Sequence, residues 1–373
     1  MTIPVPGQGP YQHATRVPNP TTATFSCGKF HTLRFDENGA LSQLAFDVDG
    51  VNTSLATTKN AVGLYQYQTF VNEDYNVFLQ DFTERVQGRS YRACPSPRYK
   101  PGAPDDLDCR NFRKPNVSHA HPIHAVYLPT LRQLWRVADS NSDVSDSDTG
   151  SNTNTARMNT NTDTTQCQFL LQLDMDADAH RLAGAPERLV VLVNVSAGVV
   201  RWDVVQVKKT PTRLPESSFF SFVPDVDKKG WRMQVLGSWM SPTDVVGSRD
   251  DDSGDDSGDA SGDGTNRGAG DHSPVYGGSP HLLGIESASW SSTGQEGETM
   301  SPKFALTLSS LDVPVVSAGS PSPFPSPRTE APDMDGGIHF NIFQNLWNTN
   351  YVLWYPFREA DRHLRSRFEL EVT

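Results

Sequence analysis

The feature that most constrains the fold of this chain is a long series of short segments with the composition of β-strands, each ended by turn residues. Apolar and polar residues alternate in Phe30 to Phe35 and in Leu41 to Val48, on either side of the segment Asp36-Glu37-Asn38-Gly39. Two alternating segments joined by such a turn predict a β-hairpin. Because alternation leaves each strand with one face to bury, the pattern favours packed sheets.

Segments of the same kind recur along the chain. We expect further strands at Gly63 to Phe70, Ala125 to Val137, Phe169 to Asp174, Leu189 to Val195, Val199 to Val207, Phe219 to Val223, Trp231 to Trp239, His281 to Trp290, Lys303 to Leu311, Gly337 to Phe343 and Phe368 to Val372. Helical spacing of apolar residues is convincing only in Glu73 to Phe82. The sequence therefore predicts a mainly β chain, a large β-sandwich with one or few short helices.

Two polar tracts interrupt this pattern, at about 139–166 and 248–272. They consist mostly of Ser, Asn, Asp, Thr and Gly, and cannot bury enough apolar surface to order themselves. We expect disordered insertions at loop tips, where added length costs little stability. Residues 1–24 lack an apolar period and predict an irregular N-terminal arm. Residues 25–373 then form one β-sandwich domain that carries both insertions.

The charge of the chain lies mainly in these insertions. Lysine and arginine total 32, aspartate and glutamate total 44, and the net charge is −12. Five aspartates accompany a single arginine in Asp139 to Asp163, and eight accompany a single arginine in Asp250 to Asp271. The rest of the chain is nearly neutral and has no basic surplus, which argues against nucleic acid as a partner.

Nothing in the sequence predicts membrane association. No stretch approaches the ~18 to 20 consecutive apolar residues of a spanning helix. The first twenty residues are polar and proline-rich, unlike a signal peptide. The default expectation is a cytoplasmic protein, although the sequence leaves the compartment open.

Cysteines and glycosylation triplets bear on the same question. The four cysteines, at 27, 94, 109 and 167, are too sparse for a disulfide scaffold. Cys94 and Cys109 flank a proline-rich loop and could be bridged in an oxidising compartment, but we favour free buried thiols. Asn52, Asn116 and Asn194 each begin an Asn-x-Ser/Thr triplet, which means little without a secretion signal.

Motifs for metals and for nucleophilic catalysis are weak or absent. The histidines of His119 to His124 have no nearby cysteine or carboxylate, so a solvated loop is the better interpretation. Asp174, Asp176 and Asp178 imitate a calcium loop, but Ala179 and Ala185 occupy the positions that need glycine and glutamate. We expect no metal and no cofactor. No nucleophile elbow or phosphate-binding glycine loop is present.

The segment richest in binding chemistry runs from Gly336 to Tyr355. Its histidine, amides and aromatic rings suit a carbohydrate, because rings stack on the apolar faces of sugars while amides and imidazoles bond their hydroxyls. A structural role for the same residues, with amides tying down loops and tryptophans filling the core, is the slightly favoured alternative. The candidate carbohydrate contacts are His339, Asn341, Asn345, Trp347, Asn350 and Trp354, with Asp244 and His281 as weaker candidates.

The run from His339 to Trp354 resembles a motif of the C-terminal β-domain of glycoside hydrolase family 38-like proteins, the α-mannosidase-related group. That motif reads His-Phe-x-Leu-x-Asn-Asn-x-Trp-Gly-Thr-Asn-Phe-Pro-x-Trp. The departures here are Gln344, Asn348, Tyr351 and Val352. Weaker similarities lie in Thr212 to Glu216, Ser241 to Val246, His281 to Gly284 and Gly63 to Phe82, so the resemblance covers roughly residues 25–373 apart from the insertions.

The resemblance implies a galactose-mutarotase-like supersandwich that binds a glycan or supports a catalytic domain. In the family, zinc and the nucleophilic aspartate lie on a separate α/β barrel whose metal site begins with His-x-Asp. None of the ten histidines here is followed two residues later by aspartate. The chain thus resembles the non-catalytic half, with zinc and an α/β-barrel partner belonging to a missing part. The alternatives are an active glycoside hydrolase that uses carboxylates of the sandwich itself, and a structural remnant without a ligand.

Overall fold

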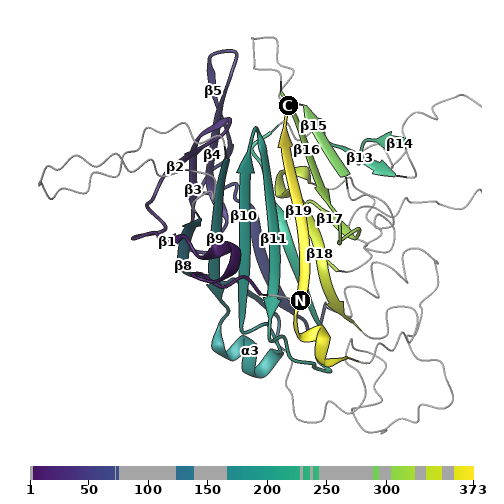
Figure 1. Ribbon diagram of the computed structural model, residues 1–373. Coiled ribbons are helices and arrows are strands. Elements are labelled where there is room, and N and C mark those ends of the chain that lie inside the picture. Colours follow the sequence, from purple (N-terminus) through teal and green to yellow (C-terminus); the bar gives the residue numbers. More distant parts are fainter. Residues whose placement is uncertain are drawn as a thin grey trace, which may run out of the picture.

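The computed structural model describes the parts of the chain that build the sandwich (Figure 1). The described residues are 3–71, 73–74, 123–137, 166–226, 230–235, 238–242, 289–293, 304–323, 333–346 and 357–373. The predicted helix at 73–82 and both polar tracts lie almost entirely outside these residues. Within them, no helix is long and apolar enough to cross a membrane.

Two antiparallel sheets form the body of the molecule, which confirms the mainly β prediction. The ten-stranded sheet has the order β1 (Ala14–Arg16), β8 (Thr130–Val137), β9 (Gln166–Asp174), β10 (Arg188–Ser196), β11 (Val199–Val207), β19 (Leu364–Val372), β16 (Ala305–Ser310), β15 (Ser289–Thr293), β13 (Arg232–Val235) and β14 (Ser238–Met240). The strand nearest the C-terminus, β19, therefore lies inside this sheet, between β11 and β16.

The nine-stranded sheet packs against the ten-stranded sheet. Its order is β17 (Val316–Ala318), β18 (Ile338–Asn345), β12 (Glu216–Phe222), β6 (Val62–Thr69), β4 (Leu41–Val48), β3 (Phe30–Phe35) and β2 (Phe25–Cys27), with β5 (Val51–Ala56) paired to β4 and β7 (Ala125–Tyr127) paired to β6. Short helical segments are η1 (Gly9–Tyr11), α3 (Ala177–Ala183), η6 (Met334–Gly336) and η7 (Glu359–Arg362).

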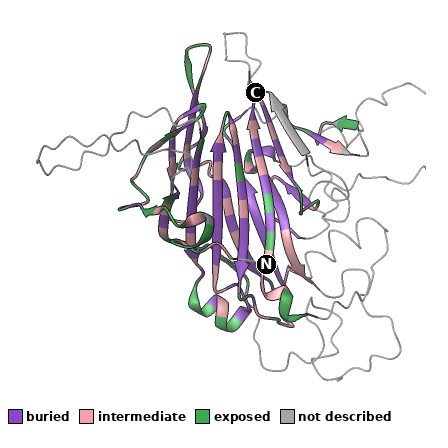
Figure 2. Ribbon diagram, in the orientation of Figure 1, coloured by how far each residue is buried: buried purple, intermediate pink, exposed green. Residues whose placement is uncertain are grey.

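Aromatic side chains hold the facing sides of the two sheets together. Phe220 and Phe222 of β12 pack on Trp202 of β11 and on Phe368 of β19. The Trp202 and Phe222 ring centroids are 5.3 Å apart, and the Phe220 and Phe368 rings stack at 4.6 Å. Buried residues alternate with more exposed ones along β16 and β19, whereas every residue of β12 is buried (Figure 2).

Gly63 permits a close approach of the two sheets. The register between β12 and β6 shifts beside Phe222 and leaves Gly63 as the extra residue of a bulge. Gly63 has a φ of +81°, and a Cβ atom there would lie 2.8 Å from Nε1 of Trp202. Only glycine meets both requirements at this position.

The first residues of the chain do not remain irregular as expected. Strand β1 pairs with β8 and extends the ten-stranded sheet at its edge. Ile3, Tyr11 and Ala14 pack on an apolar cluster on the outer side of that sheet, formed by Val137, Leu170, Val190, Leu192, Val205 and Val207. The first residues of the chain cover apolar side chains on the outer side of the ten-stranded sheet. They contact the sheet from one side only, which is why their sequence shows no regular apolar period.

Two segments that were each predicted as one strand form two strands in the structure. The segment predicted at 125–137 divides at Leu128-Pro129 into β7, which belongs to the nine-stranded sheet, and β8, which belongs to the ten-stranded sheet. Proline cannot donate to a strand ladder, so the chain crosses between the sheets there. The segment predicted at 231–239 reverses on itself as the hairpin of β13 and β14.

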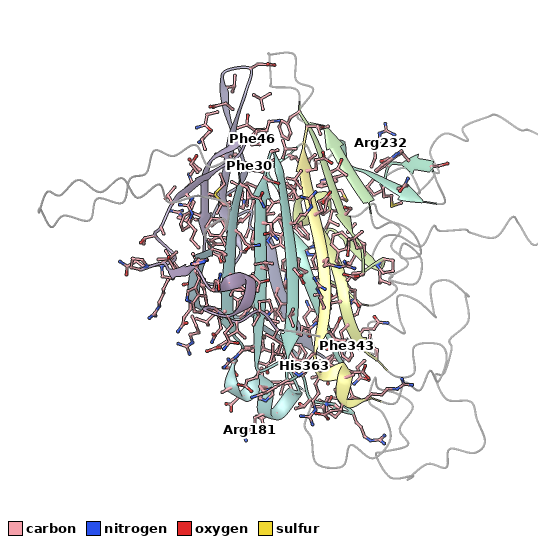
Figure 3. The ribbon with its side chains drawn as sticks, viewed as in Figure 1. Phe30, Phe46, Arg181, Arg232, Phe343 and His363 are labelled. Atoms are coloured by element: carbon pink, nitrogen blue, oxygen red, sulfur yellow. A yellow bond between two sulfur atoms is a disulfide. The ribbon has the colours of Figure 1, made fainter. Side chains whose placement is uncertain are left out.

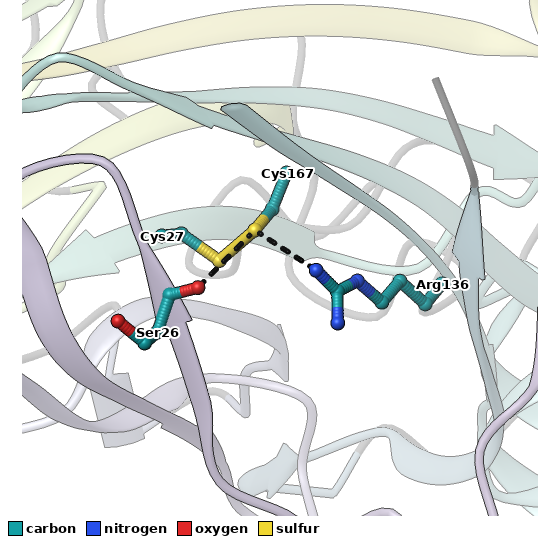
Figure 4. The surroundings of a disulfide bond; sticks show 4 residues. All are labelled: Ser26, Cys27, Arg136 and Cys167. Carbon is teal, nitrogen blue, oxygen red and sulfur yellow. Dashed lines mark hydrogen bonds between the residues drawn. A yellow bond between two sulfur atoms is a disulfide. The ribbon is translucent and has the colours of Figure 1, made fainter. Parts of the chain in front are cut away.

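A disulfide also joins the two sheets, contrary to the expectation of free thiols. Cys27 of β2 and Cys167 of β9 are bonded although 140 residues separate them (Figure 4). Sγ of Cys167 lies 3.6 Å from the carbonyl oxygen of Ser26 and 3.9 Å from Nη2 of Arg136. No local pattern predicts this pairing, because only the packing of the sheets brings the two strands together. Cys94 and Cys109 lie outside the described residues.

Candidate functional site

His339 and Asn341, two of the predicted carbohydrate contacts, point away from the sandwich core on β18. Nδ1 of His339 lies 2.8 Å from Oγ of Ser221, and Nδ2 of Asn341 donates to Oγ of Ser217 at 2.9 Å. Both serines belong to β12, the neighbouring strand. His339 is only 3% exposed and Asn341 is 7% exposed. These two side chains bond neighbouring strands and offer little surface to a ligand.

The environment of His339 keeps its imidazole neutral. Burial lowers the pKa of His339 to about 4, and the backbone carbonyls of Gly336 and Gly319 offset this only in part. A neutral ring can accept or donate one hydrogen bond but carries no charge at physiological pH.

A bulge between Ser218 and Phe219 separates Asn345 from the other two residues. Phe219 pairs with Asn341, but Ser218 pairs with Phe343, so Ile342 is the extra residue. Because side chains alternate along a strand, one extra residue turns the following side chains to the opposite face. Asn345 therefore faces inward, while His339 and Asn341 face outward. The three described candidates do not converge on one site.

Asn345 belongs instead to a buried polar cluster around Glu216. Nδ2 of Asn345 and Oγ1 of Thr212 donate to Oε1 of Glu216 at 3.1 and 3.2 Å. Nζ of Lys209 lies 2.8 Å from Oε2, and the hydroxyl of Tyr67 donates to the same oxygen. The carboxylate thus has partners on β6, β18 and the segment before β12.

Lys209 is enclosed as completely as its partner. The side chains of Lys209 and Glu216 are each 1% exposed. Nζ of Lys209 also donates to the carbonyl oxygens of Gly184 and Thr210 at 3.2 and 3.3 Å, and it lies 4.5 Å from the centre of the Phe343 ring. Phe343 lies at the end of the sandwich that carries Arg181 of α3 (Figure 3). The Lys209–Glu216 ion pair therefore connects several segments at this end of the sandwich and is inaccessible to solvent.

The electrostatics of this cluster act on Tyr67. Burial, and then the negative charge of Glu216, hold the pKa of Tyr67 well above its usual value. The protonated hydroxyl also lies 2.6 Å from the carbonyl oxygen of Ala183, the last residue of α3. Tyr67 therefore links the buried carboxylate to the helix.

An open cleft lies on the other side of Ala183. It has a volume of about 540 Å³ and is lined by Thr69, Ile123, Val126, Tyr127, Leu128, Asp176, Asp178, Leu182, Ala183 and Leu214. We call it the α3 cleft. Ala183 thus faces both the cleft and, through its carbonyl oxygen, the buried Tyr67. The α3 cleft combines one aromatic ring, two carboxylates and several aliphatic side chains.

Helix α3 positions the two carboxylates. Oδ1 of Asp176 accepts from the backbone N–H groups of Asp178 and Ala179 and so caps the helix at its N-terminus. Oδ1 of Asp178 pairs with Nη2 of Arg181 at 2.8 Å. The C-terminus of the helix is ended by Gly184 in the left-handed conformation. An aspartate at the N-cap and a glycine after the last turn are ordinary sequence signals for a helix. Asp176 and Gly184 therefore predict α3 in the segment that imitates a calcium loop.

Tyr127 is the polar aromatic residue of the cleft. Burial, and then the charge of Asp176, raise the pKa of Tyr127, while a hydrogen bond with Thr69 acts in the opposite direction. Its hydroxyl therefore stays protonated at neutral pH and can donate a hydrogen bond to a ligand.

Exposed aliphatic side chains surround the same cleft. Ile123, Val126, Leu128 and Leu182 are exposed by 40 to 58%, and all four line it. They make up half of the large hydrophobic residues that the described residues leave exposed. Together they form an exposed apolar patch at this end of the sandwich.

The remaining predicted contacts, Trp347, Asn350, Trp354, Asp244 and His281, lie outside the described residues. Of the histidines in His119 to His124, only His124 is described, and Nδ1 of its ring lies 3.0 Å from a carboxylate oxygen of Asp74. Within the described residues, no group of three or more potential ligands could hold a metal ion.

No protein-family model matches the chain, and no curated protein matches its sequence. Several solved structures are similar to it, among them the following three. One is an α-mannosidase from Enterococcus faecalis V583, at 6% identity and a TM-score of 0.41, over 96% of this chain and 30% of that one. Another is a protein in glycosyl hydrolase family 38 from Enterococcus faecalis, at 7% identity and a TM-score of 0.39, over 96% of this chain and 31% of that one.

The third is a GalM/aldose epimerase homologue from C. elegans, at 11% identity and a TM-score of 0.31, over 96% of this chain and 99% of that one. These names belong to the groups that the sequence resembles. The chain spans only about 30% of the length of the two family 38 structures. At these identities and TM-scores, no activity or substrate follows from the likeness.

Proposed function

We propose that this chain is a non-catalytic, carbohydrate-associated β-sandwich that binds a glycan in the α3 cleft. The observation that carries the proposal is the composition of this cleft. Tyr127 and the surrounding aliphatic side chains offer apolar surface to a sugar ring, while Asp176 and Asp178 offer acceptors for its hydroxyl groups. A volume of about 540 Å³ has room for a short oligosaccharide.

The other candidate residues divide into two groups in this proposal. His339, Asn341 and Asn345 act as supports, because each bonds a neighbouring strand and is wholly or largely buried. Trp347, Asn350, Trp354, Asp244 and His281 keep the predicted role of glycan contacts. The structural role of His339, Asn341 and Asn345 is supported by their burial and by their hydrogen bonds to neighbouring strands.

A non-catalytic role is favoured over glycoside hydrolysis by the state of the described carboxylates in and beside the α3 cleft. Hydrolysis needs one carboxyl group to donate a proton and a second to act as base or nucleophile. Asp176 is engaged as a helix cap, Asp178 is paired with Arg181, and Glu216 is closed to solvent. No zinc or other cofactor enters the proposal.

The second candidate function is to pack against a catalytic domain and stabilise it. Its favouring observation is the group of exposed aliphatic residues Ile123, Val126, Leu128 and Leu182. An α/β-barrel domain or subunit, as the family resemblance implies, could cover such a surface. Both candidates use the same end of the sandwich.

Glycan binding is tested by titrating the chain with a panel of mannose-containing oligosaccharides and measuring affinity by calorimetry. Tyr127→Ala should weaken binding at least about fivefold, since an aromatic contact contributes on the order of 1 kcal/mol beyond its buried area. Trp239→Ala removes an exposed aromatic residue on β14, outside the cleft lining, and should leave affinity unchanged.

Two outcomes contradict the proposal. In one, no oligosaccharide binds, or Tyr127→Ala binds as well as the original chain while its unfolding transition is normal. In the other, the chain hydrolyses aryl mannosides in the presence of zinc and a chelator abolishes the turnover, which makes it catalytic.

A further inference from the structure

The β4–β5 hairpin projects from the sandwich at the end opposite α3 (Figure 1). Its two-residue turn, Asp49-Gly50, has φ angles of 50° and 79°, as expected of a tight hairpin turn. Asn52 follows the turn on β5 and lies directly across from Asp47 of β4. Asn52 and both turn residues are exposed (Figure 2).

Asn52 begins the triplet Asn52-Thr53-Ser54, an acceptor pattern for N-linked glycans. A glycan is bulky and strongly hydrated, so the folded protein must present its asparagine at the surface. The hairpin tip meets this condition. Asn194, which also begins such a triplet, lies in the central strand β10, is only half-exposed, and accepts a hydrogen bond from Nε2 of Gln168 at 2.7 Å.

The Cys27–Cys167 disulfide is independent of the triplet and points to the same cellular environment. Both cysteines are buried, and their bond links the two sheets of the sandwich. Structural disulfides form and persist in oxidising compartments and are rare in the cytosol. Transfer of oligosaccharides to asparagine takes place on the same route.

We infer that Asn52 carries an N-linked glycan and that the chain folds in an oxidising, secretory compartment. In the transfer step, the amide nitrogen of Asn52 forms a bond to the anomeric carbon of an oligosaccharide. The bond between that carbon and a lipid-linked diphosphate breaks, and the diphosphate leaves with the electron pair. The amide proton passes to a base of the transferase.

The position of Asn52 gives the glycan a structural consequence. Within the described residues, β5 pairs with no strand except β4, so the part of β5 beside Asn52 lies at a sheet edge, and the carbonyl oxygen of Leu55 farther along accepts from the backbone N–H of Asp225. Exposed strand edges invite pairing with other chains. A hydrated oligosaccharide beside this edge opposes such pairing.

Protein isolated from its native cells under thiol-blocking conditions and digested without reductant provides the direct test. Mass spectrometry should find Asn52 glycosylated and the Cys27 and Cys167 peptides linked. Free thiols at both cysteines would overturn the assigned compartment, and an unmodified Asn52 in disulfide-bonded protein would overturn the assigned site.

Variants expressed through a eukaryotic secretory route test the same assignment. Asn52→Gln and Ser54→Ala should each abolish one glycosidase-sensitive mobility shift, whereas Thr53→Ala keeps the triplet and should keep the shift. Asn194→Gln should not remove that shift. A shift that persists in Asn52→Gln and disappears in Asn194→Gln would assign the glycan to β10 and contradict the inference. Neither readout depends on glycan binding in the α3 cleft.

Discussion

Asn345 and Glu216 are direct cross-strand neighbours, with Nδ2 of Asn345 3.1 Å from Oε1 of Glu216. This contact exists because the bulge beside Ser218 turns the end of β18 inward. Without the bulge, Asn345 would face outward together with His339 and Asn341. One extra residue therefore decides that an amide of the conspicuous C-terminal motif stabilises a buried charge.

Removal of the Glu216 charge should be strongly destabilising. Glu216→Gln leaves the ammonium group of Lys209 buried without its counter-ion, and breaking such a pair costs about 3 to 5 kcal/mol. Denaturant unfolding measures the loss. The double variant Lys209→Met/Glu216→Leu should recover most of it, because neither charge then needs a partner.

An exposed ion pair serves as the control for this prediction. Nε of Arg201 lies 2.6 Å from Oε2 of Glu369, and the two side chains are 52% and 36% exposed. Glu369→Gln should change the free energy of unfolding by less than about 1 kcal/mol. Equal losses at Glu216 and Glu369 would show that the buried pair has no special role.

Stability should depend on the protonation of His339. Its pKa in the folded chain is about 4, below the ordinary value of 6.5, so between these values the unfolded chain binds more protons. The contribution of neutral His339 to the free energy of unfolding is therefore fully present above about pH 6.5. It decreases by on the order of 3 kcal/mol as the pH falls toward 4.

The measurement compares the original chain with His339→Gln between pH 4 and pH 7.5. The difference in their free energies of unfolding should shrink as pH falls. A difference that stays constant across this range would contradict the buried neutral imidazole.

Loss of the disulfide should destabilise the sandwich by about 2 to 5 kcal/mol, because the bond closes a long loop of the unfolded chain. Unfolding is measured with and without reductant. Cys27→Ser/Cys167→Ser should start from the lower stability and show no further response to reductant. A reductant effect of equal size in that variant would assign the effect to other cysteines.

Gly63→Ala should destabilise the chain more than Gly50→Ala. Both glycines have positive φ angles, but an added Cβ meets Trp202 at position 63 and nothing within 4 Å at position 50. Strain alone costs on the order of 1 kcal/mol at Gly50, and overpacking adds about 1 to 3 kcal/mol at Gly63. Thermal unfolding of the two variants gives the comparison.

Local patterns in the sequence predict much of the strand content. The hairpin of Phe30 to Val48 and the strand Val199 to Val207 have the expected bounds, because alternation and turn residues are local properties. The division of 125–137 between two sheets was missed, since its alternation continues across Pro129. Strand β1 was missed because its partner β8 is more than a hundred residues away.

The site was less predictable than the fold. The composition of the C-terminal motif drew attention to His339, Asn341 and Asn345, but not to the bulge that separates them. Lys209 and Glu216 are seven residues apart in sequence, but Tyr67 lies 149 residues before Glu216, and nothing local marks the three as partners. The α3 cleft is likewise an outcome of packing between β7 and α3.

The location of β19 sets the order in which the molecule can be assembled. Because Leu364–Val372 lies between β11 and β16, the ten-stranded sheet consists of two separate halves until that strand has been synthesised. A ribosome-bound chain that ends before Leu364 cannot close its hydrophobic core. The sandwich must therefore complete its folding late, from contacts distant in sequence, and until then its unfinished strand edges remain open to pairing with other chains.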